Sequence, residues 1–357
     1  MTGRPDPLRI DWIEDLDAPR DEWNRLAAEA GNVFATWEWA SHWWRHYGRD
    51  GQRAVAAVPG PDGRYRALLP LVTQRWGPVR TARFIGHGTA DELGPVCAPA
   101  DRPTAARALR SALDETGCHV LLAEHLTPAG DWATLLDGTV LRREGFPLVR
   151  SSGGWEAYLG TRSRNWRKKH REIERRLRRD HELRFRLAHD PVRLDADVDE
   201  LVSLYRMRWP QGSEFLDHVD FHRDLAHTAL RRGWLRLWFL HLDGQPAACS
   251  YGFRFAGIES GFVYARDPRF ERQSVGTMLH VHVMREALAE GAGEYRFLRG
   301  DDAYKYRFST DDPQLVTVGI GQGTRGRAAL AAGVAVDRLA PLRRRLLPAA
   351  PPAPAAP

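Results

Sequence analysis

The chain has 357 residues, 43% of them hydrophobic and 10% aromatic, which is enough apolar material for about two domains with cores of their own. It has no run of ~18 apolar residues, which excludes a membrane-spanning helix, and its first residues lack the apolar core of a signal peptide. Cys97, Cys118 and Cys249 are scattered and form neither a disulfide framework nor a zinc spacing. We therefore expect a cytoplasmic protein without a transmembrane segment or a bound metal.

Positive charge is concentrated in two segments of a chain whose formal net charge is +6. Residues 162–179 contain ten basic and two acidic residues, and residues 321–357 contain six arginines and one acid. The rest of the chain is net negative. Because the basicity is local, it favours a local anion-binding site over a protein whose whole surface binds nucleic acid.

The first part of the chain mixes predicted strands and helices. Ala40, Trp43, Trp44 and Tyr47 recur at helical spacing, and the turn sequence PGPDG separates two strand-like runs. The expected elements are a strand at 8–13, a helix at 22–30, the aromatic helix, strands at 53–58 and 65–73, a helix at 103–116 and a buried strand at 119–123. The Gly/Ser stretch 151–154 is the predicted linker to the second part.

The second part opens with a basic helix at 162–180, on which Trp166, His170, Ile173 and Leu177 form one narrow stripe. The expected elements after it are helices at 195–209 and 218–232, strands at 234–242, 245–255 and 258–265, a helix at 275–290, a strand at 294–298, and a helix at 324–347 interrupted at Pro341 and followed by a disordered tail. Asp243-Gly244 predicts a hairpin turn. Both parts together predict an α+β (mixed α/β) fold.

The segment after the strand at 258–265 has the features of a phosphate site. A polar loop leads into a helix that begins at Ser274, a predicted N-cap, and Gly276 removes side-chain bulk from its first turn. The unpaired amides and positive dipole end of such a helix bind anions, and Arg269 and Arg272 add charge nearby.

Three segments, in this order, resemble the GNAT superfamily of N-acyltransferases. They are SRNWRKK at 163–169, RQSVGTML at 272–279 and the GDxxYK hexapeptide at 300–305. The resemblance is closest to the branch grouped with the cellulose-biosynthesis protein CelD and related to the FemABX peptidyltransferases. The aromatic run at 34–44 and GHGTAD at 86–91 also resemble the N-terminal half of these proteins.

The resemblance implies tandem GNAT-like domains, each a central mixed sheet flanked by helices. The expected division is an N-terminal GNAT-like domain at 1–150, a C-terminal acyltransferase domain at 151–320, and an Ala/Arg/Pro-rich helix with a disordered tail at 321–357.

The resemblance also implies direct transfer of an acyl group from acyl-coenzyme A, with acetyl-CoA foremost, to a primary amine on a small molecule or peptide. The loop residues implied in donor binding are Arg272, Gln273, Ser274, Gly276 and Thr277. Met278 stands where the family motif has its second Gly or Ala. An acyl-carrier protein or an aminoacyl-tRNA therefore remains open as the donor.

Direct transfer needs a group that takes the amine proton and an acid for the leaving thiolate. The candidates are Lys305, Asp301, Tyr304, Tyr264 and Glu259, with Asp267 as a further base. Each also has a structural interpretation. Glu259 and Asp267 fit turns, Asp301 and Asp302 fit helix caps, the tyrosines fit packing positions, and Lys305 fits an ion pair with Asp301 or Asp302.

The basic helix supplies the candidate substrate-binding residues Arg164, Arg167 and Lys168, which we expect to meet phosphates. The alternatives are a solvated charged face and a tRNA contact. His280 and His282 point to different helix faces and are predicted as core or surface histidines rather than metal ligands.

The leading hypothesis is a GNAT-type N-acyltransferase. The alternatives are a FemABX-like transferase that uses aminoacyl-tRNA, and a non-catalytic module that keeps the fold and binds an anionic partner.

Overall fold

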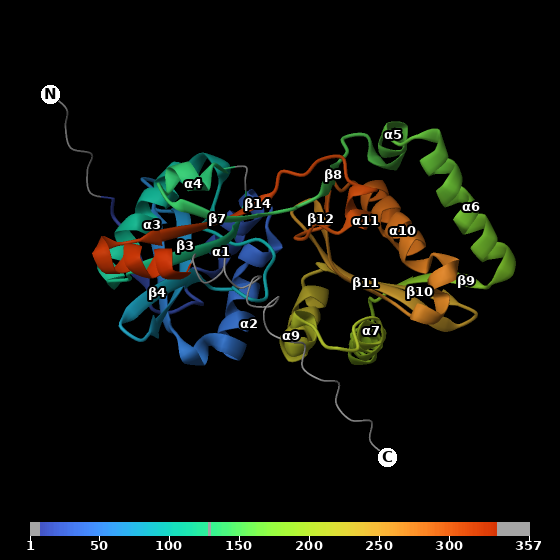
Figure 1. Cartoon of the computed structure of the whole chain (residues 1–357), viewed down its shortest axis with the longest axis horizontal. Coiled ribbons are helices and arrows are strands. Elements are labelled where there is room, and N and C mark those ends of the chain that lie inside the picture. The colour runs from blue at the N-terminus through green and yellow to red at the C-terminus, as the bar shows by residue number, and fades with distance from the viewer. Residues whose placement is uncertain (1–7, 128–129, 334–357) are drawn as a thin grey trace, which may run out of the picture.

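The computed structural model describes residues 8–127 and 130–333, and it contains two mixed β-sheets that lie side by side (Figure 1). The first sheet has the order β1-β2-β3-β4-β6-β14-β7, with β5 beside β3, and the second has the order β8-β13-β12-β11-β10-β9. Helices pack against both sheets. The predicted class, α+β with two mixed sheets in tandem, is confirmed.

The strands of the first sheet are β1 Asp11–Ile13, β2 Gln52–Pro59, β3 Tyr65–Trp76, β4 Val79–Phe84, β5 Val96–Cys97, β6 Val120–Leu126, β7 Thr139–Glu144 and β14 Leu315–Gly321. Those of the second are β8 Leu148–Arg150, β9 Leu183–Leu187, β10 Leu235–Leu242, β11 Gln245–Phe255, β12 Ile258–Arg266 and β13 Glu294–Arg296.

The α-helices are α1 Arg20–Ala30, α2 Trp37–Tyr47, α3 Arg102–Thr116, α4 Trp132–Leu135, α5 Gly154–Thr161, α6 Arg164–Asp180, α7 Leu194–Arg208, α8 Glu214–Asp217, α9 Val219–Arg231, α10 Val275–Ala289 and α11 Ala303–Tyr306. Short 3-10 helices are η1 Val33–Ala35, η2 Gly48–Asp50, η3 Pro99–Asp101 and η5 Pro268–Gln273. No described helix has the length and apolar composition needed to cross a bilayer.

The chain passes between the sheets twice. Strand β8 pairs with β13 and so begins the second sheet, and β14 returns to the first sheet between β6 and β7. The sequence analysis did not predict β8, β14 or β7, because each is short and pairs with strands that are far away in the chain. The predicted domain limits at 150 and 320 therefore fall at the end of β8 and within β14, and the division stays a prediction.

The long predicted elements are present within a few residues of their expected ends. The hairpin turn at Asp243-Gly244 has both residues at positive φ, +51° and +76°, which is the geometry of a two-residue hairpin. Ser163 caps α6 by accepting a hydrogen bond from the amide of Trp166, and Ile173 and Leu177 are buried as the stripe predicts. Residues 323–333 are helical. The predicted continuation past 333, with Pro341 and the tail, lies outside the described residues.

The second sheet separates two cores because its side chains alternate between its faces. Leu237 and Phe239 of β10 pack in one core with α7, whereas Trp238 and Leu240 pack in the other with α10. Figure 1 shows α7 and α10 on opposite sides of this sheet. This two-sided arrangement positions the site described below.

Buried polar contacts join the two halves. Arg296 of β13 donates to a carboxylate oxygen of Glu92 at 2.8 Å and to the carbonyl of Gly31 at 2.9 Å. The buried carboxylate of Glu38 in α2 accepts from Arg20 at 3.2 Å and also pairs with Arg232, just after α9. Such pairs fix the mutual position of the halves because breaking a buried ion pair leaves an uncompensated charge.

Candidate active site

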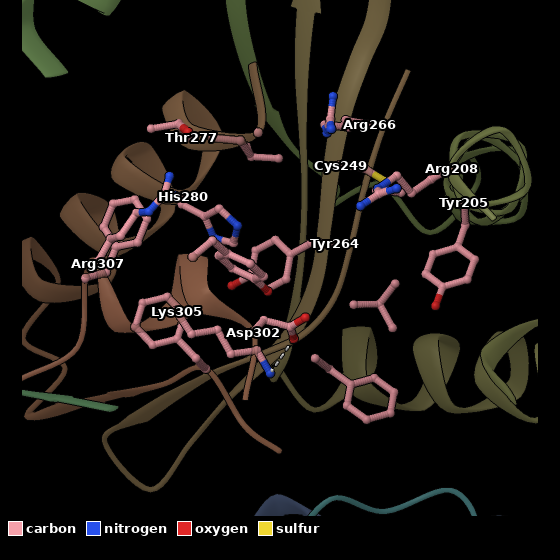
Figure 2. A pocket seen from close by; sticks show the side chains of 18 of the residues that line it. Tyr205, Arg208, Cys249, Tyr264, Arg266, Thr277, His280, Asp302, Lys305 and Arg307 are labelled. Carbon is pink, nitrogen blue, oxygen red and sulfur yellow. Dashed lines mark ion pairs between the residues drawn. The ribbon is translucent and has the colours of Figure 1, made fainter. Parts of the chain in front are cut away.

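A gap in the second sheet forms the main cavity of the described chain. Strands β12 and β13 pair in parallel only from Ile258 to Ser260, and then diverge. One extra residue bulges β12 at Phe262, because Tyr251 pairs with Val263 but Gly252 pairs with Gly261. The cavity, about 590 Å³, lies in this divergence and is lined from α6, α7, α10 and α11 as well as β12 (Figure 2).

The N-terminal turn of α10 opens onto the cavity through Gly276 and Thr277. The first amides of a helix have no acceptor within it, so they are available to an anion. Ser274 stands at the N-cap position, but its φ is +60° and its side chain makes no capping bond, contrary to the N-cap expectation. A Cβ on Gly276 would meet Cδ of Arg266 at 3.4 Å, so this arginine lies directly beside the helix start.

The lining is strongly cationic. One carboxylate, Asp302, faces six basic side chains: Lys169, Arg208, Arg266, Arg299, Lys305 and Arg307. Arg266 pairs with Glu271 at 2.8 Å, Arg299 with Asp91 at 3.3 Å, and Lys305 with Asp302 at 3.4 Å. Within the described ranges, no carboxylate lies within 4 Å of the side-chain nitrogens of the three remaining unpaired cations, Lys169, Arg208 and Arg307. The cavity is therefore suited to an anionic ligand.

An imidazole that lies between two phenol rings lines the cavity. The ring of His280 lies 4.0 Å from that of Tyr264 and 4.9 Å from that of Tyr304, centre to centre. Burial lowers the pKa of His280 to about 3, so this ring is neutral. The predicted core position is thus correct, and the ring also faces the cavity. His282 instead stacks on Phe185.

The two tyrosines differ in what their hydroxyls contact. The Tyr264 hydroxyl shares a short hydrogen bond with that of Tyr295, in space that exists because residue 261 is glycine. Burial raises the pKa of Tyr264 to about 12. Burial also raises the pKa of Tyr304 above its usual value, and no protein group of the described chain bonds its hydroxyl. Tyr304 is therefore a protonated phenol whose hydroxyl is free to donate a hydrogen bond to a ligand.

Lys305 lies at the cavity wall with all three ammonium hydrogens occupied. Its Nζ bonds the carbonyl of Arg299 at 2.5 Å and that of Leu298 at 3.4 Å, and lies 3.4 Å from a carboxylate oxygen of Asp302. Burial lowers its pKa, with Asp302 opposing the shift. The residue is 5% exposed. Lys305 thus holds the turn that follows β13 in place.

The remaining residues of GDxxYK serve the same turn. Gly300 has φ +118°, and its Cβ would lie 3.1 Å from the Lys305 ammonium, so glycine is required there. Asp301 is outside the cavity lining and accepts from the amide of Gly145 at 3.0 Å and from the Tyr306 hydroxyl at 3.1 Å. The motif fixes the turn to the segment before β8.

Glu259 is also outside the lining. Its carboxylate lies 3.3 Å from Arg236 and 3.6 Å from Arg254, which also pair with Glu290. Burial raises its pKa to about 7 against the two arginines. Asp267 is buried and accepts from the amide of Arg269 at 2.8 Å, as expected of a turn carboxylate.

The other predicted binding residues lie around the cavity rather than in its wall. Arg272 and Gln273 end η5, and the Arg272 carbonyl accepts from Arg176 of α6 at 3.4 Å. Arg164, Arg167 and Lys168 are on α6 but do not line the cavity, whereas the adjacent Lys169 does.

The lining residues that sequence reasoning missed include Lys169, Arg208, Arg266, Arg299, Arg307, and His280 as a cavity residue. A signal existed for Lys169, which follows Trp166 by three positions on a helix and so shares its face. Arg208 carries no such signal, because α7 reaches the cavity only through the fold.

The three cysteines are free and buried, and Cys249 lines the cavity. Burial raises its pKa well above the usual value, so it stays a thiol and is a poor nucleophile. No cluster of three or more metal-ligating side chains occurs among the described residues.

The open helix start, the turn motif and all but two of the residues that line the cavity lie in the segment that matches a family model, the acetyltransferase (GNAT) domain, over residues 164–306. This segment of the chain is a GNAT domain. The fold of the chain is related to that of the FemABX proteins. A solved structure of FemX superposes with a TM-score of 0.64 at 10% identity, covering 87% of this chain and 96% of FemX.

Two further solved structures share the fold of this chain. A conserved protein of unknown function from Bacteroides thetaiotaomicron gives a TM-score of 0.56 at 13% identity, covering 87% of this chain and 99% of that one. L-PGS from Bacillus licheniformis gives 0.52 at 12% identity, covering 83% and 95%. No curated protein matches the sequence.

Proposed function

We propose that this GNAT protein transfers an acyl group from an acyl thioester, acyl-coenzyme A first, directly to a primary amine. The observation that carries the proposal is the gap between β12 and β13, which opens beside the start of α10. A strand gap accepts an extended acyl-bearing arm, and the helix start accepts the phosphates attached to it.

The α10 face of the sheet carries helix amides and cations that match the negative phosphates of the acyl donor. The amides near Gly276 and Thr277 and the guanidinium of Arg266 would hold a pyrophosphate. Lys169 and Arg307, which have no carboxylate within 4 Å in the described chain, would meet a further phosphate. Arginine and helix amides together give charge-assisted hydrogen bonds, which are the stronger class.

Transfer would proceed in one step. The amine attacks the acyl carbon, a backbone amide of β12 beyond Ser260 donates to the carbonyl oxygen, and the thiolate leaves. The free hydroxyl of Tyr304 gives its proton to the thiolate, and Asp302, the carboxylate of the lining, takes a proton from the amine. Because Cys249 remains a thiol, no acyl-enzyme is needed.

Calorimetry with coenzyme A tests the donor site. Gly276→Glu places a carboxylate at the helix start and should weaken binding more than tenfold, because it repels phosphate where the wild type attracts it. Gly160→Glu is the matched control, since Gly160 lies on α5, is exposed and is outside the lining. Mass spectrometry of an amine panel with acyl-CoAs then looks for the acylated product. Equal affinity of the wild type, Gly276→Glu and Gly160→Glu for coenzyme A would refute this donor site.

A second candidate function is aminoacyl transfer from tRNA, as the FemABX resemblance implies. The observation that favours it is the exposed face of α6, where Arg164, Lys169, Arg171, Arg175 and Arg176 have no carboxylate within 4 Å in the described chain. Binding of tRNA through these cations would weaken steeply with salt. Product formed with aminoacyl-tRNA, and not with acyl-CoA, would select this function.

A further inference from the structure

The cavity passes through the second sheet, and its cations are divided between the two faces. Tyr264 and Arg266 of β12 point to the α10 face, where Thr277 and His280 lie, whereas Val263 and Ala265 point to the α7 face. Figure 2 shows Tyr205 and Arg208 on the α7 side of the gap and Thr277 and His280 on the other. The gap thus connects the two faces, and a ligand bound on the α7 face can meet a ligand bound on the α10 face there.

The α7 face has one cation, Arg208, without a direct carboxylate partner in the described chain, although the charge of Glu271, the partner of Arg266, also acts on it. Arg299 pairs with Asp91 and lies 3.6 Å from Glu214, and Lys305 is saturated as described above. Arg208 lies in the last turn of α7, is exposed, and has no carboxylate within 4 Å of its guanidinium in the described chain. The charge available to a ligand on this face is therefore that of Arg208.

The Arg208 side chain is positioned rather than loose. Its guanidinium lies over the ring of Trp209, 4.6 Å from the ring centre, and Trp209 itself lines the cavity. Stacking on an aromatic face orders an arginine while leaving its donor fork free, which suits bidentate binding of a carboxylate or phosphate. Tyr205, one turn earlier on α7, presents a hydroxyl to the same space.

From this arrangement we propose that the amine acceptor carries an anionic group, a carboxylate or a phosphate, and that Arg208 binds it. The inference rests on the proposed function, because a donor on the α10 face leaves the α7 face to the acceptor. The amine of the acceptor then enters the gap, and its anionic end remains outside against Arg208 and Trp209.

Matched acceptor pairs test the inference in the intact protein. β-Alanine and β-alaninamide differ in the carboxylate, and phosphoethanolamine and ethanolamine differ in the phosphate, so the two pairs also distinguish the two anions. The acceptor's kcat/KM should be roughly 10- to 100-fold higher for the charged member, the effect of one charge-assisted pair. The amide has the more weakly basic amine, so the first comparison is biased against the expected result.

The Arg208→Gln variant should abolish the preference by raising KM for the charged acceptors while kcat, and KM for the acyl donor, stay near the wild-type values. Arg206→Gln is the matched control, because Arg206 is exposed on the same helix and does not line the cavity. A merely structural role of Arg208 would lower kcat for charged and neutral acceptors alike.

Each outcome decides one question. Acylation of charged and neutral amines with equal kcat/KM refutes the inference and leaves the acyltransferase proposal intact. If no amine is acylated, calorimetry with β-alanine and phosphoethanolamine decides. Binding that is lost in Arg208→Gln supports the anion site and refutes the transfer reaction, and the absence of binding refutes both.

Discussion

The two sheets contain the same kind of parallel strand pair, but the spaces beside the two pairs differ greatly. In the first sheet, β4 and β6 pair from Thr81 to Arg83, and Leu93 then bridges to Leu126, which closes the divergence. Beside β12 no such bridge follows the pairing of Ser260 with Arg296 in the described chain, and the cavity of about 590 Å³ lies there. The divergence of a strand pair thus becomes a ligand site only where no other segment fills it.

The segment that closes the divergence in the first sheet also supports the cavity in the second sheet. The segment that supplies Leu93 carries Asp91, which pairs with Arg299 at the cavity, and Glu92, which pairs with Arg296 of β13. The first sheet thereby supports the turn after β13, from which several lining residues come. The first half of the molecule acts as a support and the second half as the candidate active site.

The largest expected loss of activity comes from a substitution that loosens the turn after β13. Lys305→Met removes the ammonium that holds the carbonyls of Leu298 and Arg299 and leaves both unsatisfied. We expect acyl transfer to fall by roughly 100-fold, as displacement of the lining by about 1 Å does elsewhere. Steady-state kinetics and thermal unfolding measure the two consequences. Lys168→Met, on the exposed face of α6, should change neither, and equal losses in both variants would contradict a specific role for Lys305.

The next effect should be on stability alone. Leu93→Ala reopens the closed divergence in the first sheet and should lower the free energy of unfolding by about 2 to 4 kcal/mol, as loss of a buried leucine does. Activity per folded molecule should persist at low temperature, because Leu93 does not line the large cavity. Chemical denaturation and kinetics on the same preparation measure both. A loss of activity that exceeds the loss of folded protein would show that the first sheet shapes the site directly.

The two regions can also be compared through two histidines. Burial lowers the pKa of His280 in the cavity, and of His87 in the turn after β4, to about 3. The unfolded chain then binds more protons, so stability falls as pH falls from about 6.5 toward 3. For His280 this amounts to about 2 kcal/mol between pH 7 and pH 5.

His280→Phe and His87→Phe should each flatten the pH dependence of unfolding, measured by denaturant titration at pH 5 and pH 7. The His280 variant alone should also change binding of coenzyme A, since only that ring lines the large cavity. An unchanged slope in both variants would mean that other buried histidines dominate the acid sensitivity.

Local patterns predicted the long helices and strands of the second half, but not α5 or β9, because periodicity, the Ser163 cap and the Asp243-Gly244 turn act over a few residues. They did not predict β14, whose partners β6 and β7 lie almost 200 residues earlier in the chain. The site shows the same limit. Gly276 and Tyr304 were found from motifs, whereas Arg208 comes from a helix with no motif and reaches the cavity only through packing.

The smallest effect is expected at Glu259, a candidate base from the sequence that the fold places in an ion cluster. Glu259→Gln keeps the shape of the side chain, and Arg236 and Arg254 retain Glu290 as a partner. Because the wild-type pKa is raised to about 7, the carboxylate is partly protonated at neutral pH and its replacement should change stability by less than about 1 kcal/mol. The kcat and its pH profile should match the wild type. A kcat that falls by tenfold or more in a variant with unchanged unfolding would instead make Glu259 part of the proton path, through the base of the gap at Tyr295 and Tyr264.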